Sequence, residues 1–314
     1  MSDIKYLVDT YYLNLENFSH QTSSHWKKYG VFSKISFKRP VNSSRSSDHK
    51  YQNFEYVKIL KLQGGGFGDF KKLSVFNFIV NLPILIYLFL KYWRTLKLNT
   101  FLTTFKYSIR TRQIFSYDLT RMSLTLDYLT KKLEFLPTST ITIIGDGYGR
   151  LGCLLKEKFP DCKIIQINLG RTLLFDYYYS LKFLPTLNHK LIKENNDFSE
   201  FDFAYIEVEL YQNFKFSSDL FINIASMQEM NMNQIAGHFD LIKSQVKSAH
   251  FYCCNRISKI LPDGSEINFY EYPWGNLEIL DDELCPWYQT FPTLKPPFIK
   301  KFDGPIQHRL AKLI

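Results

Sequence analysis

The clearest pattern along the chain is an alternation of short apolar runs with segments of helical spacing between residues 141 and 254. The apolar runs predict buried strands, whereas segments with apolar side chains every three or four positions predict helices. The expected strands are 141–144, 163–167, 203–208, 220–224 and 250–254, and the expected helices are 151–159, 173–183 and 233–246. Because strands joined by helices form parallel sheets, we expect an α/β fold: a Rossmann-like, doubly wound, mostly parallel sheet with its ligand at the carboxyl edge.

The segments after this core are less regular. Residues 267–272 and 306–313 are two further expected strands, the second antiparallel, and the aromatic stretch 272–297 between them is expected to be loop. Within that stretch, Asp281-Asp282-Glu283 is expected to form an exposed acidic cluster.

Two segments before the core predict helices. Residues 103–136 place apolar side chains at steps of three and four. Residues 75–93, VFNFIVNLPILIYLFLKYW, are the most apolar part of the chain, but two asparagines and Pro83 favour a buried helix starting near Pro83 over a membrane span, which needs about 20 apolar residues. The alternative is a helix that lies on an anionic membrane face, because lysines and arginines flank it.

A glycine-rich segment precedes these helices at residues 63–69, QGGGFGD. No apolar strand leads into it and no Lys-Ser/Thr follows it, so a flexible turn is expected here and not a phosphate-binding loop.

Charge divides the chain into two parts. Residues 1–135 contain 21 Lys+Arg and 9 Asp+Glu, a net charge of +12, whereas the remainder has a net charge of −3. We therefore expect a basic, aromatic and largely helical N-terminal accessory region at 1–105, followed by the Rossmann-like domain at 106–314. A basic region beside a nearly neutral domain suggests an anionic partner, such as lipid headgroups or a pyrophosphate-linked carrier.

Composition excludes several classes of protein. Hydrophobic residues make up 45% and charged residues 22%, as in globular proteins and unlike disordered ones. No RNP-like string or aromatic–basic repeat is present, so nucleic acid is not an expected partner. The five cysteines and seven histidines show no metal-ligand spacing, and the cysteines are expected to be buried, reduced thiols. The acidic N-terminus argues against export, so we expect a cytoplasmic protein with peripheral contact to the inner membrane face.

The segment ITIIGDGYGRLGC, Ile141 to Cys153, carries the candidate chemistry. An apolar strand that ends in alternate glycines and continues as a helix is typical of nucleotide-binding turns. Three interpretations remain open: a turn for S-adenosylmethionine (SAM) with Gly145 directly after the strand, a dinucleotide turn with Gly147 first, or a structural turn without a ligand. For the dinucleotide, Asn168 and Arg171 would seat an NADP 2′-phosphate, and the spacing Tyr178-x-x-x-Lys182 is like that of short-chain reductases. The position of Gly145 directly after the strand favours SAM.

Four segments support a resemblance to a known family. GDGYGRL, KIIQINLGRTLLFDYYYSLKFLP, DLFINIASMQEM and HFYCCNR, within residues 140–256, resemble bacterial sugar O-methyltransferases that accompany surface-polysaccharide biosynthesis. The resemblance implies a class I SAM-dependent fold, SAM as cofactor, and a sugar or glycan acceptor in nucleotide-linked, lipid-linked or free form. It implies cofactor-binding roles for Gly145, Asp146, Gly147, Gly149, Arg150, Asn168 and Ser226.

Two positions depart from the family pattern. Asn168 stands where the family has a ribose-binding aspartate, and Ile143 stands where methyltransferases commonly have an acid. An asparagine can still hydrogen-bond a hydroxyl, but without the contribution of the charge. An NADP-dependent oxidoreductase and a catalytically weakened paralogue that binds nucleotide or glycan therefore stay as alternatives.

A base that removes the hydroxyl proton would assist methyl transfer. Glu229, in Ser226-Met227-Gln228-Glu229-Met230 after the fourth strand, is the candidate expected to face the methyl group. His238 is the second candidate and is expected to lie further down the following helix. Arg110, Arg112 and Arg121, from the helical segment before the core, could reach the same cleft.

Overall fold

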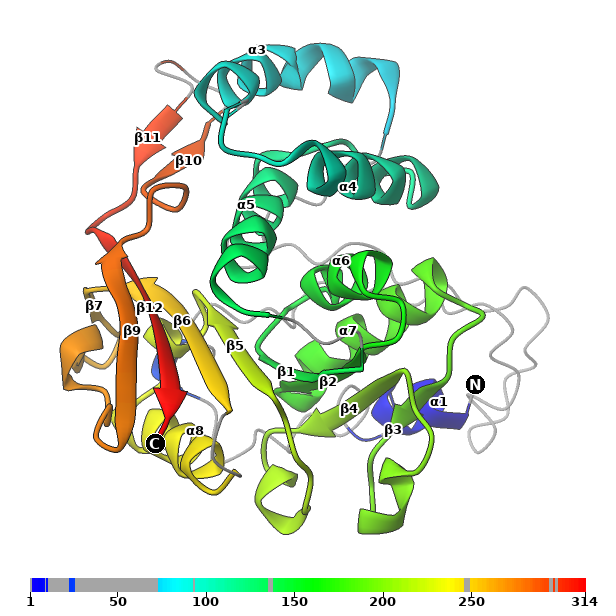
Figure 1. Cartoon of the computed structure of the whole chain (residues 1–314), viewed down its shortest axis with the longest axis vertical. Coiled ribbons are helices and arrows are strands. Elements are labelled where there is room, and N and C mark those ends of the chain that lie inside the picture. Colours follow the sequence, from blue (N-terminus) through cyan, green and yellow to red (C-terminus); the bar gives the residue numbers. More distant parts are fainter. Residues whose placement is uncertain are drawn as a thin grey trace, which may run out of the picture.

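The computed structural model of the chain describes residues 2–8, 10, 23–25, 73–92, 94–134, 138–245, 249–293, 296 and 299–314. The glycine-rich segment at 63–69 lies outside these residues. Figure 1 shows a central sheet with helices on both faces and a group of helices from the N-terminal half beyond one face.

Eight strands form the central sheet, in the order β3-β4-β2-β1-β5-β6-β12-β9. Only β12 runs antiparallel to the others. The strands are β1 (Thr140–Ile144), β2 (Lys163–Asn168), β3 (His189–Leu191), β4 (Phe203–Glu207), β5 (Leu220–Ile224), β6 (His250–Arg256), β9 (Leu277–Leu284) and β12 (Ile306–Leu313). The central strands are buried on both faces, which explains their continuous apolar runs.

The order of these strands identifies the type of fold. Without the short edge strand β3, the seven strands numbered along the chain lie in the order 3-2-1-4-5-7-6, with the antiparallel last strand inserted beside the edge. Its parallel part, 3-2-1-4-5, is that of a doubly wound sheet. The predicted Rossmann-like, mostly parallel sheet is therefore confirmed.

Helices cover the two faces of the sheet unequally. The helices are α1 (Ser2–Val8), α3 (Val75–Tyr92), α4 (Leu98–Arg110), α5 (Tyr117–Lys132), α6 (Arg150–Lys158), α7 (Gly170–Phe183) and α8 (Met232–Lys243). One apolar core joins the sheet to α5, α6 and α7, and a second core joins the other face to α8. The helices predicted at 151–159, 173–183 and 233–246 are confirmed to within three residues at each end.

The helical segment predicted over 103–136 is largely confirmed, and it consists of two helices, α4 and α5, separated by residues 111–116. The Ser116 side chain caps α5 by accepting a hydrogen bond from the backbone N–H of Leu119 at 3.3 Å. The boundary expected between residues 105 and 106 falls inside α4.

The expectation for residues 267–297 is also corrected. Of the strand expected at 267–272, only the first two residues are in a strand, β8 (Glu266–Asn268), which pairs with β7 (Ser258–Ile260). The next residues, Phe269–Glu271, form a 3₁₀ turn. The stretch expected to be loop contains β9, an edge strand of the main sheet that is mostly exposed. Because an edge strand is held mainly by backbone pairing, its sequence lacks the apolar run of a buried strand. A further pair, β10 (Thr290–Pro292) and β11 (Ile299–Lys301), extends towards α3 (Figure 1).

The predicted buried helix near Pro83 is α3, and its burial was predicted wrongly. It begins at Val75, includes Pro83, and buries only Asn81, Ile84, Leu88 and Tyr92. Among the described residues it is the one helix long and apolar enough to cross a membrane by length and composition alone.

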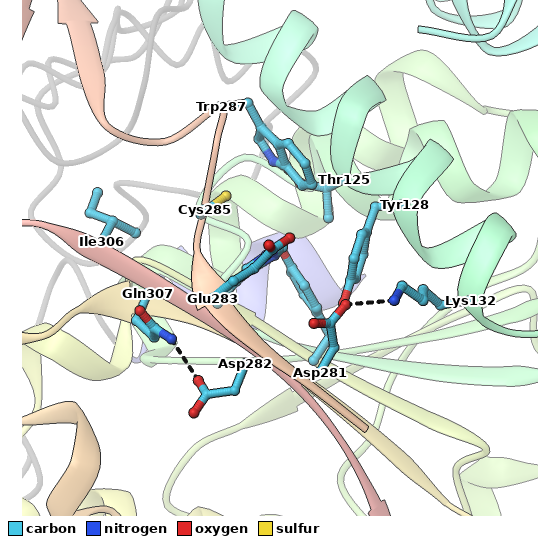
Figure 2. Close-up of polar contacts among 12 residues, drawn as sticks. Thr125, Tyr128, Lys132, Asp281, Asp282, Glu283, Cys285, Trp287, Ile306 and Gln307 are labelled. Atoms are coloured by element: carbon cyan, nitrogen blue, oxygen red, sulfur yellow. Dashed lines mark hydrogen bonds and ion pairs between the residues drawn. The ribbon is translucent and has the colours of Figure 1, made fainter. Parts of the chain in front are cut away.

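Strand β9 carries the acidic cluster, and its side chains have partners (Figure 2). Asp281 accepts a 2.8 Å hydrogen bond from the hydroxyl of Tyr128 and pairs with Lys132 at 2.8 Å, both on α5. Asp282 pairs with Arg309 of β12 at 2.6 Å. The cluster is half-buried to exposed, and its ion pairs join α5 to the edge of the sheet.

Candidate functional site

The glycine turn after β1 has a backbone that requires glycine. Gly145, Gly147 and Gly149 have φ angles of 79°, 83° and 64°, all in the left-handed region. A Cβ atom on Gly145 would lie 2.3 Å from the Ser226 hydroxyl oxygen, and one on Gly149 would lie 2.3 Å from that of Ser180. Both conformation and space therefore exclude a larger residue here.

Asp146 is used to build the turn. Its carboxylate accepts backbone N–H groups of Leu151 at 3.1 Å and Gly152 at 2.9 Å, and the side-chain amide of Gln166 at 3.1 Å. These contacts fix the first turn of α6 to β2. Burial raises the pKa of Asp146, and the two backbone hydrogen bonds and the nearby Arg150 oppose that rise.

Asn168, at the end of β2, is held by an acid that the sequence analysis did not select. Its side-chain amide donates to Asp176 of α7 at 2.8 Å, and the other oxygen of Asp176 accepts the backbone N–H of Gly149 at 2.9 Å. Asp176 is fully buried, and burial together with the charge of Asp146 raises its pKa well above the usual value. The available signal was an acid inside the apolar run LLFDYYY.

A cavity of about 940 Å³ lies above this turn, at the carboxyl ends of β1, β2 and β5. Such a volume is within the range of small-molecule sites. Eight of the nine residues selected from the sequence line it: Gly145, Asp146, Gly147, Arg150, Asn168, Ser226, Glu229 and His238. Gly149 is buried and is absent from the lining.

Glu229 lies at the cavity wall, but its carboxylate already has a cation and an imidazole beside it, the latter neutral at pH 7 because burial lowers the pKa of His25 to about 4. Glu229 is 8% exposed and lies 3.1 Å from the Lys259 ammonium and 3.4 Å from the imidazole of His25. Its backbone carbonyl accepts a hydrogen bond from the Ser23 hydroxyl. Burial raises the pKa of Glu229, and the charges of Lys259 and Arg256 oppose that rise. The segment 23–25 thus closes over the candidate base.

His238 lines the cavity from α8. It is 1% exposed and stacks on Tyr211 with ring centres 5.2 Å apart. Burial lowers its pKa to about 4, and its Nδ1 has no hydrogen-bond partner in the described part of the chain. A histidine with this pKa is neutral at pH 7 and is a weak base.

Another part of the cavity lining combines arginines with aromatic rings. The guanidinium of Arg121 lies 4.6 Å from the ring centre of Tyr288, 5.8 Å from that of Phe302, and forms an ion pair with Asp118. Arg256 lies 5.6 Å from the ring centre of Phe302. The sequence did not predict Arg256, Tyr288 or Phe302 as site residues. Arg256 follows an expected strand, Tyr288 lies in an expected loop, and Phe302 lies between that loop and the last expected strand.

The other cations proposed for the cleft lie elsewhere. Arg110 pairs with Glu157 of α6 and Arg112 is exposed. The Tyr178 and Lys182 pair of the reductase interpretation lies on α7, where neither side chain lines the cavity. All five cysteines are buried, as predicted. Within the described residues, no group of three or more His, Cys, Asp and Glu side chains could hold a metal ion.

Comparison with known proteins gives structural likeness only. No protein-family model and no curated protein matches the chain. Coclaurine N-methyltransferase bound to N-methylheliamine and SAH is 10% identical, with 63% of this chain and 73% of that chain covered and a TM-score of 0.43. The mitomycin 7-O-methyltransferase is 8% identical, with 66% and 60% covered and a TM-score of 0.39. The precorrin-6y C5,15-methyltransferase of Geobacter metallireducens is 11% identical, with 60% and 86% covered and a TM-score of 0.38. These likenesses concern the fold alone.

Proposed function

We propose that the protein is a SAM-dependent methyltransferase that methylates a sugar hydroxyl. The observation that carries the proposal is the left-handed glycine turn after β1, at the floor of a cavity in a sheet with the strand order 3-2-1-4-5-7-6. In this fold the carboxyl ends of the strands are where ligands bind.

The residues at the floor fit SAM. Gly145 and Gly147 line the cavity without a side chain, so a ligand can approach their backbone, and Asn168 offers a polar side chain at the end of β2. The Asp146 carboxylate, which accepts two backbone N–H groups, lines the cavity and would place an acid near a cationic sulfonium and ammonium group. SAM supplies the methyl group on its sulfonium, and S-adenosylhomocysteine is the product that leaves.

Glu229 is proposed as the base. As the new C–O bond forms, the hydroxyl proton would pass to a carboxylate oxygen of Glu229, whose raised pKa suits it to accept a proton near neutral pH. Lys259 keeps this carboxylate in place, and segment 23–25 shields it from water. Alignment of the hydroxyl with the methyl group would contribute the larger part of the rate.

A sugar acceptor is proposed from the arginines and aromatic rings of the cavity lining and from the sequence resemblance. Aromatic rings such as Tyr288 and Phe302 present apolar faces to a sugar ring, and Arg121 and Arg256 add hydrogen-bond donors. The four segments that resemble sugar O-methyltransferases support a nucleotide-linked or lipid-linked sugar, whose phosphates would suit these arginines.

One observation disfavours the NADP alternative. Glu207, at the end of β4, lies directly beside Asn168 in the parallel ladder and is 6% exposed. Burial raises its pKa to about 7. A 2′-phosphate seated at Asn168 would lie near this acid, whereas an unmodified ribose could donate hydrogen bonds to it.

Titration calorimetry with SAM, S-adenosylhomocysteine and NADPH tests the proposal. We expect the first two to bind and NADPH not to bind; binding of NADPH alone would reverse the assignment. Radiolabelled methyl transfer from SAM to nucleotide sugars and to lipid-linked glycans then tests turnover. SAM binding without transfer to any hydroxyl acceptor would favour the weakened paralogue.

A further inference from the structure

The most exposed apolar surface of the described chain lies on α3. Val75, Phe76 and Ile79 are 78%, 75% and 62% exposed, although each belongs in a protein interior by its chemistry. Further exposed apolar side chains on this helix are Phe78, Val80, Leu82, Ile86, Phe89 and Leu90. A contiguous apolar surface of this kind marks a contact with a partner or a membrane.

Helix α4 has its polar face buried and its apolar face exposed. Thr100, Thr104 and Ser108 point inward, and Thr104 shares a 2.7 Å hydrogen bond with Ser123 of α5. The apolar side chains at steps of four, three and four are exposed: Leu98, Leu102, Phe105 and Ile109. Apart from Tyr107, this helix buries small polar side chains and offers an apolar stripe outward, unlike a helix that only packs on a core.

The charge of this region has one sign. Between Leu73 and Tyr117 the sequence has six cations, Lys91, Arg94, Lys97, Lys106, Arg110 and Arg112, and no Asp or Glu. All six are exposed. A protein interface between neutral partners would not need this excess, whereas an anionic lipid surface attracts each such residue.

We propose that α3 and α4 form a docking surface for an anionic membrane, with the exposed apolar side chains inserted among the headgroups. Figure 1 shows both helices on the outer side of α5, away from the sheet. The opposite side of α3 is fixed to the protein: Ile84 and Leu88 are in the main core, and the hydroxyl of Tyr92 donates to the carbonyl of Pro286 at 3.2 Å. The helix therefore lies along the lipid surface and does not cross it.

The docking surface adjoins the cavity. Ile84, on the buried side of α3, is part of the cavity lining. Docking would hold this wall of the cavity beside the membrane and favour an acceptor presented at the lipid surface. The docking itself does not depend on the proposed methyl transfer.

Flotation of the full-length protein with vesicles tests the proposal. Vesicles of phosphatidylcholine alone are compared with vesicles that contain about one third phosphatidylglycerol, at about 0.05 M and about 0.5 M salt. We expect flotation with the anionic vesicles, weakened at high salt, and little flotation with the neutral ones.

Two sets of variants separate the contributions. Phe76→Ser/Phe89→Ser/Leu90→Ser should weaken partition at least about tenfold, because inserted apolar area drives binding. Its control is Ile260→Ser, which removes a 71% exposed side chain from β7.

Lys91→Glu/Arg94→Glu should weaken partition by about 25-fold or more, because each basic residue contributes about fivefold. Its control is Lys182→Glu/Lys215→Glu, two exposed lysines outside the surface. Unchanged thermal unfolding shows that each variant folds.

Four outcomes would overturn the proposal. The first is absence of flotation with anionic vesicles at low salt. The second is an equal loss of flotation in the control variants. The third is retention of the protein in the vesicles after alkaline carbonate, which would indicate a spanning helix. The fourth is a dimer in light scattering that the apolar variant dissociates without changing flotation, which would assign the face to a second copy of the chain.

Discussion

The side-chain amide of Asn168 donates a 2.8 Å hydrogen bond to the buried carboxylate of Asp176, which also accepts the backbone N–H of Gly149. One pair of side chains thus joins the end of β2, the third glycine of the turn and α7. An aspartate at 168 would face a second acid here. The position of Asp176, eight residues later, therefore explains the asparagine.

Exchange of these two residues should be tolerated better than either single change. Asn168→Asp places two carboxyl groups in contact. Asp176→Asn leaves one acceptor oxygen for two donors, the Asn168 amide and the backbone N–H of Gly149. Each change should therefore cost about 1–3 kcal/mol of unfolding free energy. The double variant Asn168→Asp/Asp176→Asn restores a donor and an acceptor. It should recover more than half of that loss and retain SAM binding. Urea unfolding and calorimetry of the four proteins measure both.

The single Asn168→Asp variant also has a predicted pH dependence. Its two carboxyl groups can share one proton at low pH, so its deficit should grow as the pH rises from about 5 to about 8. A double variant no more stable than the two singles would show that the pair is not coupled.

Gly145→Ala should weaken the proposed cofactor site. The new Cβ would meet the Ser226 hydroxyl at 2.3 Å and the backbone has a φ of 79°, so we expect a loss of about 1–3 kcal/mol in stability and SAM binding at least about tenfold weaker. Thermal unfolding and calorimetry measure the two effects.

Two further variants separate backbone strain from steric contact at this glycine. Gly264 has a φ of 87° with no atom within 4 Å of an added Cβ, so Gly264→Ala should show the strain alone. Gly145→Ala/Ser226→Gly removes the clashing side chain and should recover part of the binding. Equal binding by Gly145→Ala and the unaltered protein would exclude the turn as the cofactor site.

The sequence predicted the central strands and the glycine turn because they depend on local patterns. Continuous apolar runs mark strands buried on both faces, and glycine adopts a positive φ most easily, as Gly145, Gly147 and Gly149 do here. Strand β9 was missed because its residues are mostly exposed and its place comes from pairing with β12. The exposed face of α3 was missed for a related reason. An apolar sequence indicates that the side chains favour burial, but it does not distinguish burial in the protein core from contact with a partner or a membrane.

The site was predictable only where its residues follow strands. Glu229 was selected for its place after β5, but its ion pair with Lys259 joins residues 30 positions apart. Arg256 and Phe302 are brought together by the antiparallel return of the chain near β12, which no local pattern indicates. Asp176 was missed although an acid within an apolar helix is a local signal of a buried polar partner.

Glu229→Gln should lower kcat by about 10²–10⁴-fold with the affinity for SAM unchanged, if Glu229 removes the hydroxyl proton. Because burial raises its pKa, the rate of the unaltered protein should rise with pH through a value above 4.5. Lys259→Met removes a charge that opposes this rise, so it should move the rising limb to higher pH.

The control for this prediction is Glu271→Gln, which changes an exposed glutamate away from the cavity and should leave the rate unaltered. A merely structural Glu229 would lower stability and leave the pH profile in place. Full turnover by Glu229→Gln would remove it from the reaction.

His238 should make the protein less stable at acidic pH. Its folded-state pKa is about 4, lowered by burial, whereas the unfolded chain has the ordinary value near 6.5. Protons therefore bind the unfolded chain more tightly, so the stability is present above about pH 6.5 and is lost as the pH falls towards 4. The loss at pH 5 should be about 2 kcal/mol from this residue alone.

His238→Phe keeps a ring to stack on Tyr211 and removes the titration. Urea unfolding at about pH 7.5 and pH 5 should give this variant a difference smaller by that amount. His250→Gln, at a half-buried position, should reduce the difference less, and an unchanged pH dependence in His238→Phe would show that His238 is already protonated or solvated in the folded protein.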